Sequence, residues 1–492
     1  MLRHAPPRHN WWLVLILVVA GVMRLSYVLL LPGQGRDLLH SDMGVYDLTG
    51  WQMARQEPLP NEPVLGYNGY HPLSASTLYY AGYTYFVAAI YWLFGHHPFV
   101  VRIVQALLST ATVWLVYRIG AATFSQRAGL VAAALTAVHL PLVYYAGLLV
   151  TETWFLFLQL ATLAAWQRAW DAQGVPVDHA GSQSVGRARR RAGRNACLCL
   201  ALLAGLFAGL ACITRTVFLS TVAVLGLAAV VFPPTAATWS RRFAFAALFW
   251  LAAAVVVAPV AVRNYQIHNR LILVTTNGPI TFMARVQRMM PDPKRVPDHA
   301  TDATISDRYR SQGLEYLRRD WREYLDEVPE HFYRIWFGRG YWPEATPYWM
   351  FTRLPFDPEN PRRQTMVVHE ATAPPFPRAS YFPDLANYAD TVTWLLIGLP
   401  FGLLAVFLLP RGNRHWVCLL PALTPYIITP FLAPPYPRYR VPAVPLFFIL
   451  AGHTLTILVQ IRRHWSARDD SEHTNANRHV ATAARATSRS SS

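Results

Sequence analysis

The segment from Phe99 to Thr153, "FVVRIVQALLSTATVWLVYRIGAATFSQRAGLVAAALTAVHLPLVYYAGLLVTET", decides the fold. It contains two apolar runs, 99–119 and 127–145, which are separated by a short polar stretch and followed by an acidic residue. Each run holds about 20 residues, and at ~1.5 Å per residue a helix of that length crosses a ~30 Å hydrocarbon core. The segment therefore predicts two neighbouring membrane-spanning helices.

Similar apolar runs recur along the 492 residues of the chain, of which 53% are hydrophobic and 14% are charged. They predict further spans at 11–32, 151–169, 197–214, 217–232, 243–262, 391–410, 415–433 and 440–461. The stretch 77–95, "TLYYAGYTYFVAAIYWLFG", is apolar but rich in Tyr and Trp, as is typical of a helix that lies in the membrane interface. The predicted fold class is an all-α polytopic membrane protein with about ten transmembrane helices.

The basic segments decide which loops face inward. "RARRRAGR" at 187–194, "SRR" at 240–242, "RGNRH" at 411–415 and the tail from Arg462 all fall inside if the N-terminus is inside and 77–95 does not cross. The first apolar run is then a retained anchor, because it is too long for a signal peptide. Two large outer segments result, 33–98 and 263–390, and the second is long enough for a small subdomain. The expected organisation is a catalytic module at 1–262, an outer segment at 263–390, C-terminal helices at 391–461 and a disordered cytoplasmic tail at 462–492.

The net charge of +17 is explained by this inward bias of Lys and Arg, so a role in nucleic-acid binding is not favoured. The histidines are scattered, and the outer segments contain no Asp-x-Asp pair, so neither a metal site nor a cofactor is expected. The cysteines lie in apolar stretches and are interpreted as small buried hydrophobic residues: Cys197, Cys199, Cys212 and Cys418.

Two carboxylates stand beside predicted spans on the outer face. Asp42 follows the first span, with Tyr46 four residues later on a short helix, and Glu152 lies in the turn between two spans. An ionisable residue so close to apolar sequence indicates a functional site. The alternative for each is a helix start, where an acid beside Ser41 or Thr151 is favoured by the helix dipole.

Several arginines also lie at outer span ends, where the inward bias does not place them: Arg102, Arg215, Arg263, Arg438 and Arg440. A guanidinium group binds phosphate through planar contacts with several donors. Acids and arginines together indicate a site for a phosphate-bearing lipid and a hydroxyl nucleophile. The alternative is that each arginine extends to lipid headgroups.

Six stretches, in this order, resemble bacterial membrane glycosyltransferases of the GT-C fold. They are "SDMGVYDLTGWQMARQ", "YHPLSASTLYYAGYTYFVAAIYWLFG", the quoted segment from Phe99, "GLACITRTVFL", "APVAVRNYQIHNRLILVTTNGPI" and "RYRVPAVPLFFILAG". The most similar group is the family 39/83 type, which contains protein mannosyltransferase-like enzymes and aminoarabinose transferases that modify lipid A. The resemblance covers roughly 11–275 and 390–461.

The resemblance implies transfer of a monosaccharide from a polyprenyl-phosphate donor, with inversion, on the outer face of a bacterial inner membrane. It implies that Asp42 and Glu152 are catalytic, although relatives often carry Asp-Glu where this chain has Asp42-Met43. His71, before a Pro, touches the donor phosphate or caps its segment. The implied substrate contacts, together with His71, are Tyr46, Arg102, Arg215, Arg263, Asn264, Arg438, Tyr439 and Arg440. The acceptor is lipid A, a protein or another glycan, and metal and cofactor are not implied.

Three other functions compete. A transporter or lipid flippase is disfavoured because the spans show no internal repeat and the polar residues gather at one face. A related GT-C enzyme with an oligosaccharide donor, or a polymer ligase, is disfavoured because such enzymes often have a larger outer domain or a metal site, which this sequence does not indicate. A scaffolding membrane protein leaves the outer arginines unexplained.

Overall fold

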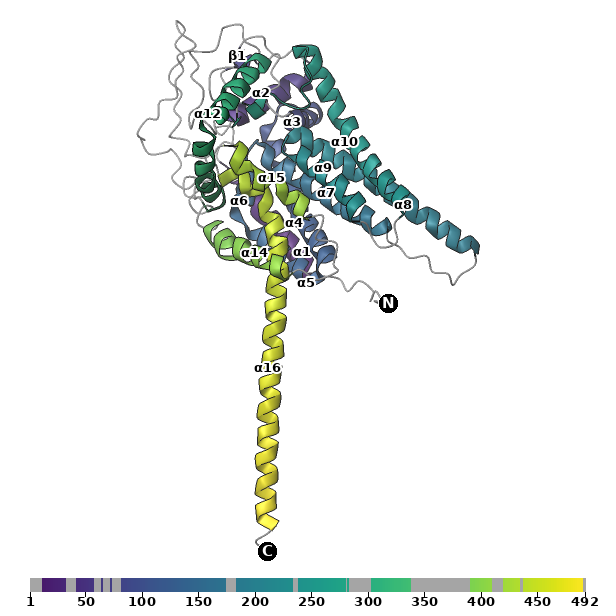
Figure 1. The fold of residues 1–492 in the computed structure, drawn as a ribbon, viewed down its shortest axis with the longest axis vertical. Helices are drawn as coiled ribbons and strands as arrows, with labels where there is room; N and C mark the ends of the chain where they lie inside the picture. Colours follow the sequence, from purple (N-terminus) through teal and green to yellow (C-terminus); the bar gives the residue numbers. More distant parts are fainter. Residues whose placement is uncertain are drawn as a thin grey trace, which may run out of the picture.

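The computed structural model describes residues 11–31, 41–56, 63–64, 71–72, 81–173, 183–232, 238–279, 281–282, 302–337, 390–408, 419–433 and 437–489. The described residues form an assembly of helices (Figure 1). Among them is one antiparallel pair of two-residue strands, β1 (Pro63–Val64) and β2 (His71–Pro72). The first half of the chain forms α1 (Trp11–Leu29), α2 (Ser41–Ala54), α3 (Ala81–Phe94), α4 (Pro98–Thr123), α5 (Gln126–Val138), α6 (Leu140–Ala146), α7 (Thr151–Gln173), α8 (Gln183–Thr214) and α9 (Phe218–Val231). The second half forms α10 (Trp239–His268), α12 (Asp302–Phe337), the π-helix η5 (Thr391–Gly398), α14 (Leu399–Phe407), α15 (Leu419–Leu432), the 3₁₀-helix η7 (Pro437–Ala443) and α16 (Val444–Arg489).

The all-α membrane fold that the sequence predicts is confirmed. Among the described residues, five helices are long and apolar enough to cross a membrane, or six if the bent pair α5 and α6 counts as one span. Shorter apolar helices cover 81–94, 218–231, 392–407 and 422–432. The number of ten spans, and the interfacial position of 77–95, stay predictions.

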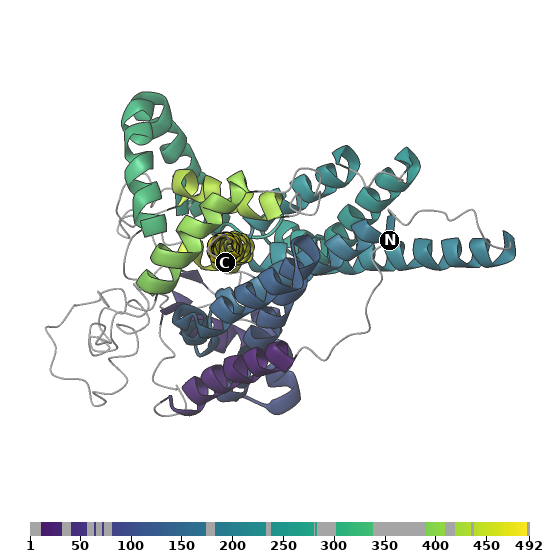
Figure 2. The same ribbon diagram turned by 90° about the horizontal axis from the view of Figure 1, so that it is seen from below.

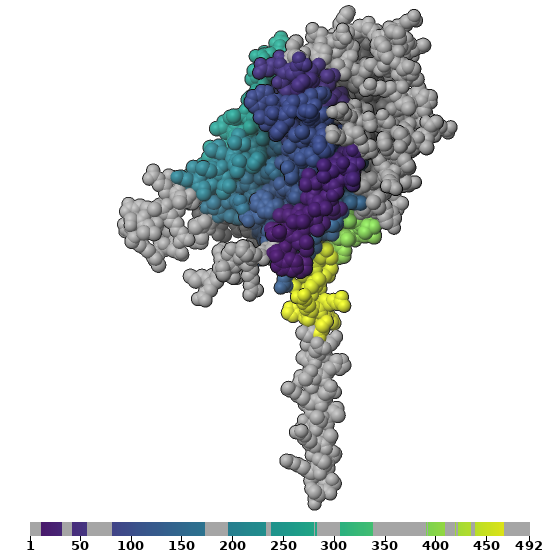
Figure 3. All heavy atoms as spheres, turned by 180° about the vertical axis from the view of Figure 1, so that it is seen from behind, coloured from purple at the N-terminus to yellow at the C-terminus, as the bar shows by residue number. Residues whose placement is uncertain are grey.

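The helices α2, α3 and the start of α12 lie at one end of the bundle, and the C-terminal half of α16 extends from the other end (Figure 1). Seen from below, α16 runs between the green C-terminal helices and the purple-to-blue N-terminal helices (Figure 2). The helix α1 lies on the surface, where it forms a ridge of exposed apolar side chains (Figure 3). Within the described residues, the parts of the two predicted outer segments at 41–54, 81–94 and the start of 302–337 therefore lie at the same end of the molecule.

The central helix is α7, which packs against α4 and α8. Phe155, Leu158 and Trp166 on this helix are fully buried. Because neighbouring helices shield it, α7 also tolerates buried polar side chains such as Gln159 and Gln167. Each is hydrogen-bonded, as buried polar groups in an apolar surrounding must be. This shielding allows α7 to carry buried polar side chains along a segment that the sequence predicts as a span.

The bend between α5 and α6 has an identifiable cause. The two helices meet at an angle of 59° around His139, and Pro141 at the start of α6 cannot continue the hydrogen bonding of α5. The fully buried Arg24 of α1 donates to the carbonyls of Thr136 at 3.1 Å and Ala137 at 3.0 Å, which the bend leaves without helical partners. Arg24 therefore stabilises the broken end of α5.

The helices α8 and α10 approach closely at two glycines one helical turn apart, Gly205 and Gly209. A Cβ atom at Gly209 would lie 2.6 Å from Val256 Cβ and 2.7 Å from the Ala253 carbonyl oxygen. Small residues spaced by four allow this contact between membrane helices.

We expect Gly209→Leu to lower the free energy of unfolding by about 1–3 kcal/mol, because overpacking must separate the helices. Thermal unfolding in detergent measures this. Gly278→Leu is the matched control, since a Cβ there meets no atom within 4 Å. Equal midpoints for the two variants would contradict the close packing of α8 on α10.

Two segments differ from expectation. The stretch 313–340 has the pattern of a helix in which Pro329 predicts a break, but α12 continues through Pro329 and its non-helical residue is Asp320, with φ −122° and ψ 33°. Pro329 lies on the exposed side, so the hydrogen bond that it removes does not belong to the packed face. The tail that composition predicts to be disordered is instead a continuation of α16 to Arg489; it contains no Gly or Pro after Gly452 that would end a helix.

Candidate active site

Glu152 stands in the first turn of α7, where the helix dipole favours a negative charge. Its side chain is 3% exposed. The Arg215 guanidinium donates from Nη2 to Glu152 Oε1 at 2.5 Å, and Nε donates to Thr151 Oγ1 at 3.0 Å. Two of the residues that the sequence singles out on the outer face are therefore a direct ion pair.

Arg215 reaches this position from the turn between α8 and α9. Its guanidinium also lies over the Phe155 ring, 5.6 Å from the centroid. The Arg215 side chain is 13% exposed, so the pair sits at the edge of the packed interior rather than in its centre. A buried carboxylate needs such a partner, because an unpaired charge there is very costly.

A narrow crevice adjoins Glu152. Its lining joins α4, α6, α7 and η7 and mixes hydroxyl groups with apolar surface: Ser109, Thr112, Leu142, Tyr145, Glu152, Thr153, Leu156 and Val441. Its side chains are closely packed and leave no room for a water molecule between them, so the carboxylate lies against the packed junction of α4, α6, α7 and η7.

The turn that precedes Glu152 is held by α4. Arg102 is fully buried and donates from Nε to the Gly147 carbonyl at 2.8 Å. Gln105 donates to the carbonyls of Ala146 at 3.1 Å and Leu148 at 2.7 Å. The contact of Arg102 with donor phosphate stays a prediction, and its buried position favours a role in fixing this turn.

The helix α3 connects Asp42 to the same region. Asp42 is half-buried in the first turn of α2. One turn later, the Tyr46 ring meets the Tyr83 ring edge-on at 4.8 Å, and the Tyr83 hydroxyl donates to Gln105 Oε1 at 2.6 Å. The Tyr83 hydroxyl also lies within electrostatic reach of Glu152. A continuous set of contacts therefore links the Asp42 helix to the Glu152 turn.

Asp47 on α2 is a buried acid that the sequence argument missed. It accepts hydrogen bonds from the Tyr91 hydroxyl and from His96 Nε2, the latter at 3.0 Å, and the Trp51 ring stacks on His96. Burial and the Asp47 carboxylate raise the pKa of Tyr91, so its hydroxyl stays protonated and donates. Asp47 lies five residues after Asp42 and faces a different side of α2, where it fastens α2 to α3.

The remaining predicted contacts lie on other elements. Asn264 is buried and donates to the carbonyls of Ile272 at 3.1 Å and Val274 at 3.0 Å, while its half-buried neighbour Arg263 is 3.4 Å from the Asn264 amide oxygen. Arg438 and Tyr439 on η7 are half-buried, with the guanidinium 5.6 Å from the tyrosine ring. His71 falls in β2, but its side chain lies outside the described part.

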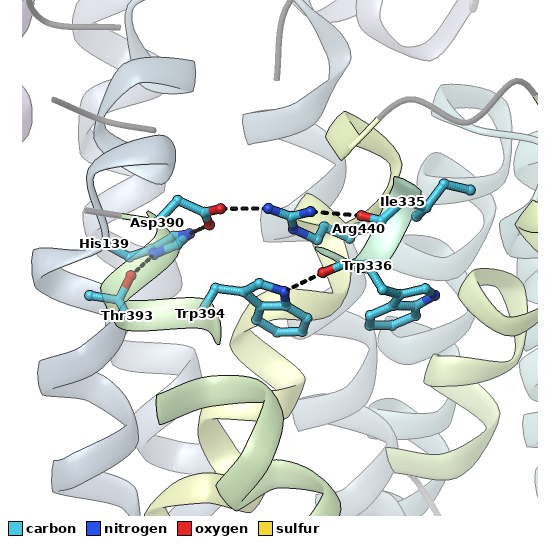
Figure 4. Close-up of polar contacts among 7 residues, drawn as sticks. All are labelled: His139, Ile335, Trp336, Asp390, Thr393, Trp394 and Arg440. Atoms are coloured by element: carbon cyan, nitrogen blue, oxygen red, sulfur yellow. Dashed lines mark hydrogen bonds and ion pairs between the residues drawn. The ribbon is translucent and has the colours of Figure 1, made fainter. Parts of the chain in front are cut away.

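Arg440 enters a buried network that also includes Asp390 (Figure 4). It donates to Asp390 Oδ2 at 2.5 Å and to the Ile335 carbonyl at 2.7 Å. His139 lies 3.6 Å from Asp390 Oδ1. Both Asp390 and His139 border apolar runs, so the rule that drew attention to Glu152 would also have found them.

The comparisons with known proteins agree with this architecture. Residues 81–176, which include α3 to α7, match the profile of a family described as dolichyl-phosphate-mannose-protein mannosyltransferase. Curated protein sequences give no match of comparable significance.

Solved structures that share the fold include two of an archaeal oligosaccharyltransferase. One is the oligosaccharyltransferase of Archaeoglobus fulgidus in the apo form, at 14% identity and a TM-score of 0.51, covering 94% of this chain and 52% of that one. The other is the archaeal oligosaccharyltransferase AglB from Archaeoglobus fulgidus in complex with an inhibitory peptide and a dolichol-phosphate, at 11% identity and a TM-score of 0.50 with the same coverage. The chain thus spans about half the length of these proteins. The expected GT-C architecture is confirmed at the level of the fold.

Proposed function

We propose that this chain is an integral-membrane glycosyltransferase that moves a monosaccharide from a polyprenyl-phosphate donor to an acceptor hydroxyl or phosphate. The observation that carries the proposal is the buried pair of Glu152 and Arg215 beside a polar and apolar crevice in a GT-C fold. The match of 81–176 to a family named for a dolichyl-phosphate sugar supports the donor class. The complex of a similarly folded protein with dolichol-phosphate supports it further.

In the proposed reaction, Asp42 acts as general base and takes the proton of the acceptor hydroxyl. The acceptor oxygen forms a bond to the anomeric carbon as the bond from that carbon to the phosphate oxygen breaks. The electron pair leaves with the polyprenyl phosphate, whose negative charge arginines stabilise. Attack opposite the leaving group inverts the anomeric centre. Glu152 orients the acceptor or tunes Asp42.

The direct experiment uses the purified full chain in proteoliposomes. Polyprenyl-phosphate monosaccharides labelled in the sugar are offered together with lipid, glycan and peptide acceptors. Transfer of label with release of polyprenyl phosphate is the expected result. Movement of the lipid across the bilayer without any transfer would instead support a flippase.

The site is proposed to face the exterior of a bacterial inner membrane, with 263–390 reading the acceptor. In a variant without the native cysteines, Ser311→Cys on α12 should react with an impermeant thiol reagent in intact cells, and Arg463→Cys on α16 should not, since both positions are exposed in the structure. Arg463→Cys should react after permeabilisation. The reverse pattern would place the site on the cytoplasmic side.

A further inference from the structure

The two arginines of η7 have different surroundings. A 3₁₀-helix has about three residues per turn, so side chains two positions apart point to different sides. Arg440 points inward with no exposed side-chain area, whereas Arg438 is half-buried. The guanidinium of Arg440 is engaged by Asp390 and by the Ile335 carbonyl, so of the two only Arg438 has an accessible surface for a ligand.

The ion pair joins elements that are distant in the chain. Asp390 precedes η5, Ile335 lies in the last turn of α12, and Arg440 belongs to η7 (Figure 4). His139, at the bend between α5 and α6, adds a hydrogen bond of 2.8 Å to the Thr393 hydroxyl and so fixes the start of η5 next to Asp390. His139, Asp390 and Arg440 are buried and Thr393 is half-buried, so the network is largely shielded from solvent.

The two residues of η7 that follow Arg440 reach the Glu152 crevice and α7. Val441 lines the crevice together with Glu152. The Pro442 carbonyl accepts a hydrogen bond of 3.0 Å from Gln159, which lies two turns after Glu152 on α7. A shift of η7 would therefore change both the lining of the crevice and the position of Arg438.

We infer that Asp390 and Arg440 are positioning residues that fix η7, so that Arg438 meets the phosphate of the lipid donor beside the Glu152 crevice. This inference rests on the proposed function, since it takes a polyprenyl phosphate as the ligand. In this inference, Arg440 is bound by other residues of the protein, and Arg438 binds the phosphate of the lipid.

The test measures binding of undecaprenyl phosphate to the full chain in detergent, alongside thermal stability. Asp390→Asn keeps the shape but removes the charge that holds Arg440, and should weaken binding roughly 3- to 30-fold. Asp390→Glu should retain most of the binding. Thr454→Val is the matched control, because it removes a buried 2.8 Å hydrogen bond between α16 and the Phe401 carbonyl far along the helix from η7. It should lower stability without changing lipid binding.

A double-mutant cycle separates positioning from general stability. If Asp390 acts through Arg438, then adding Asp390→Asn to Arg438→Ala should weaken binding by little more than Arg438→Ala alone. Arg440→Lys provides the same comparison if Asp390→Asn does not fold. Full additivity, or unchanged binding in folded Asp390→Asn and Arg440→Lys, overturns the inference. Absence of binding by the parent protein overturns the proposed function instead.

Discussion

Replacing Asp42 by asparagine is expected to reduce glycosyl transfer by ~10²–10⁴-fold while the protein stays folded. The amide keeps the size of the carboxylate but cannot accept the acceptor's proton. Asp42 is half-buried at the start of α2, in the helix whose Tyr46 contacts α3, so the loss of its charge leaves the packing of α2 in place. Transfer from a polyprenyl-phosphate sugar in proteoliposomes, with thermal unfolding in parallel, measures the effect.

Asp47→Asn is the matched control, because it makes the same chemical change on the same helix. Its carboxylate holds Tyr91 and His96, so this variant should lose thermal stability and lose transfer only in proportion to unfolding. A folded Asp42→Asn variant with parental activity would show that Asp42 is a helix cap, and the catalytic assignment would be wrong.

Removing one partner of the Glu152–Arg215 pair is expected to destabilise the protein by about 3–5 kcal/mol, because the other charge stays buried without compensation. Glu152→Gln and Arg215→Gln each make this change. The double variant should recover part of the stability, since neither charge is then buried alone. Its transfer activity should not recover, because the crevice then lacks the acid in its lining, and that acid's arginine partner is also gone. Thermal unfolding and transfer assays on the three variants separate the two roles.

A contrary result is well defined for this cycle. Should the double variant regain transfer along with stability, the pair serves packing only, and the arginine that stabilises the leaving phosphate must be sought elsewhere. If the single variants have the same midpoint of thermal unfolding as the parent protein, the ion pair between Glu152 and Arg215, at 2.5 Å in the structure, does not persist in solution.

The arginines show how far sequence reasoning extends into the site. Their position at one end of the spans is evident from charge and apolar runs, and the pairing of Glu152 with Arg215 joins two residues that were singled out independently. Arg440 and Arg102 belong to the same pattern in the sequence, yet both are buried and bonded to backbone carbonyls. The charge pattern of the sequence cannot distinguish an arginine that is bound within the protein from one that faces a ligand. The partners of Arg440, for example, lie 50 and 105 residues away in the chain.

The sequence by itself determined the all-α membrane fold and the apolar helices such as α4. A run such as 99–119 must be helical in lipid, since every backbone hydrogen bond has to be made within the segment, and this requirement is local. Tertiary structure alone decided which side chains meet: Arg24 with the end of α5, Gln105 with the turn before Glu152, and Asp390 with Arg440. These contacts depend on how helices far apart in the chain pack and bend, and a buried charge takes its role from the partner that such packing brings to it.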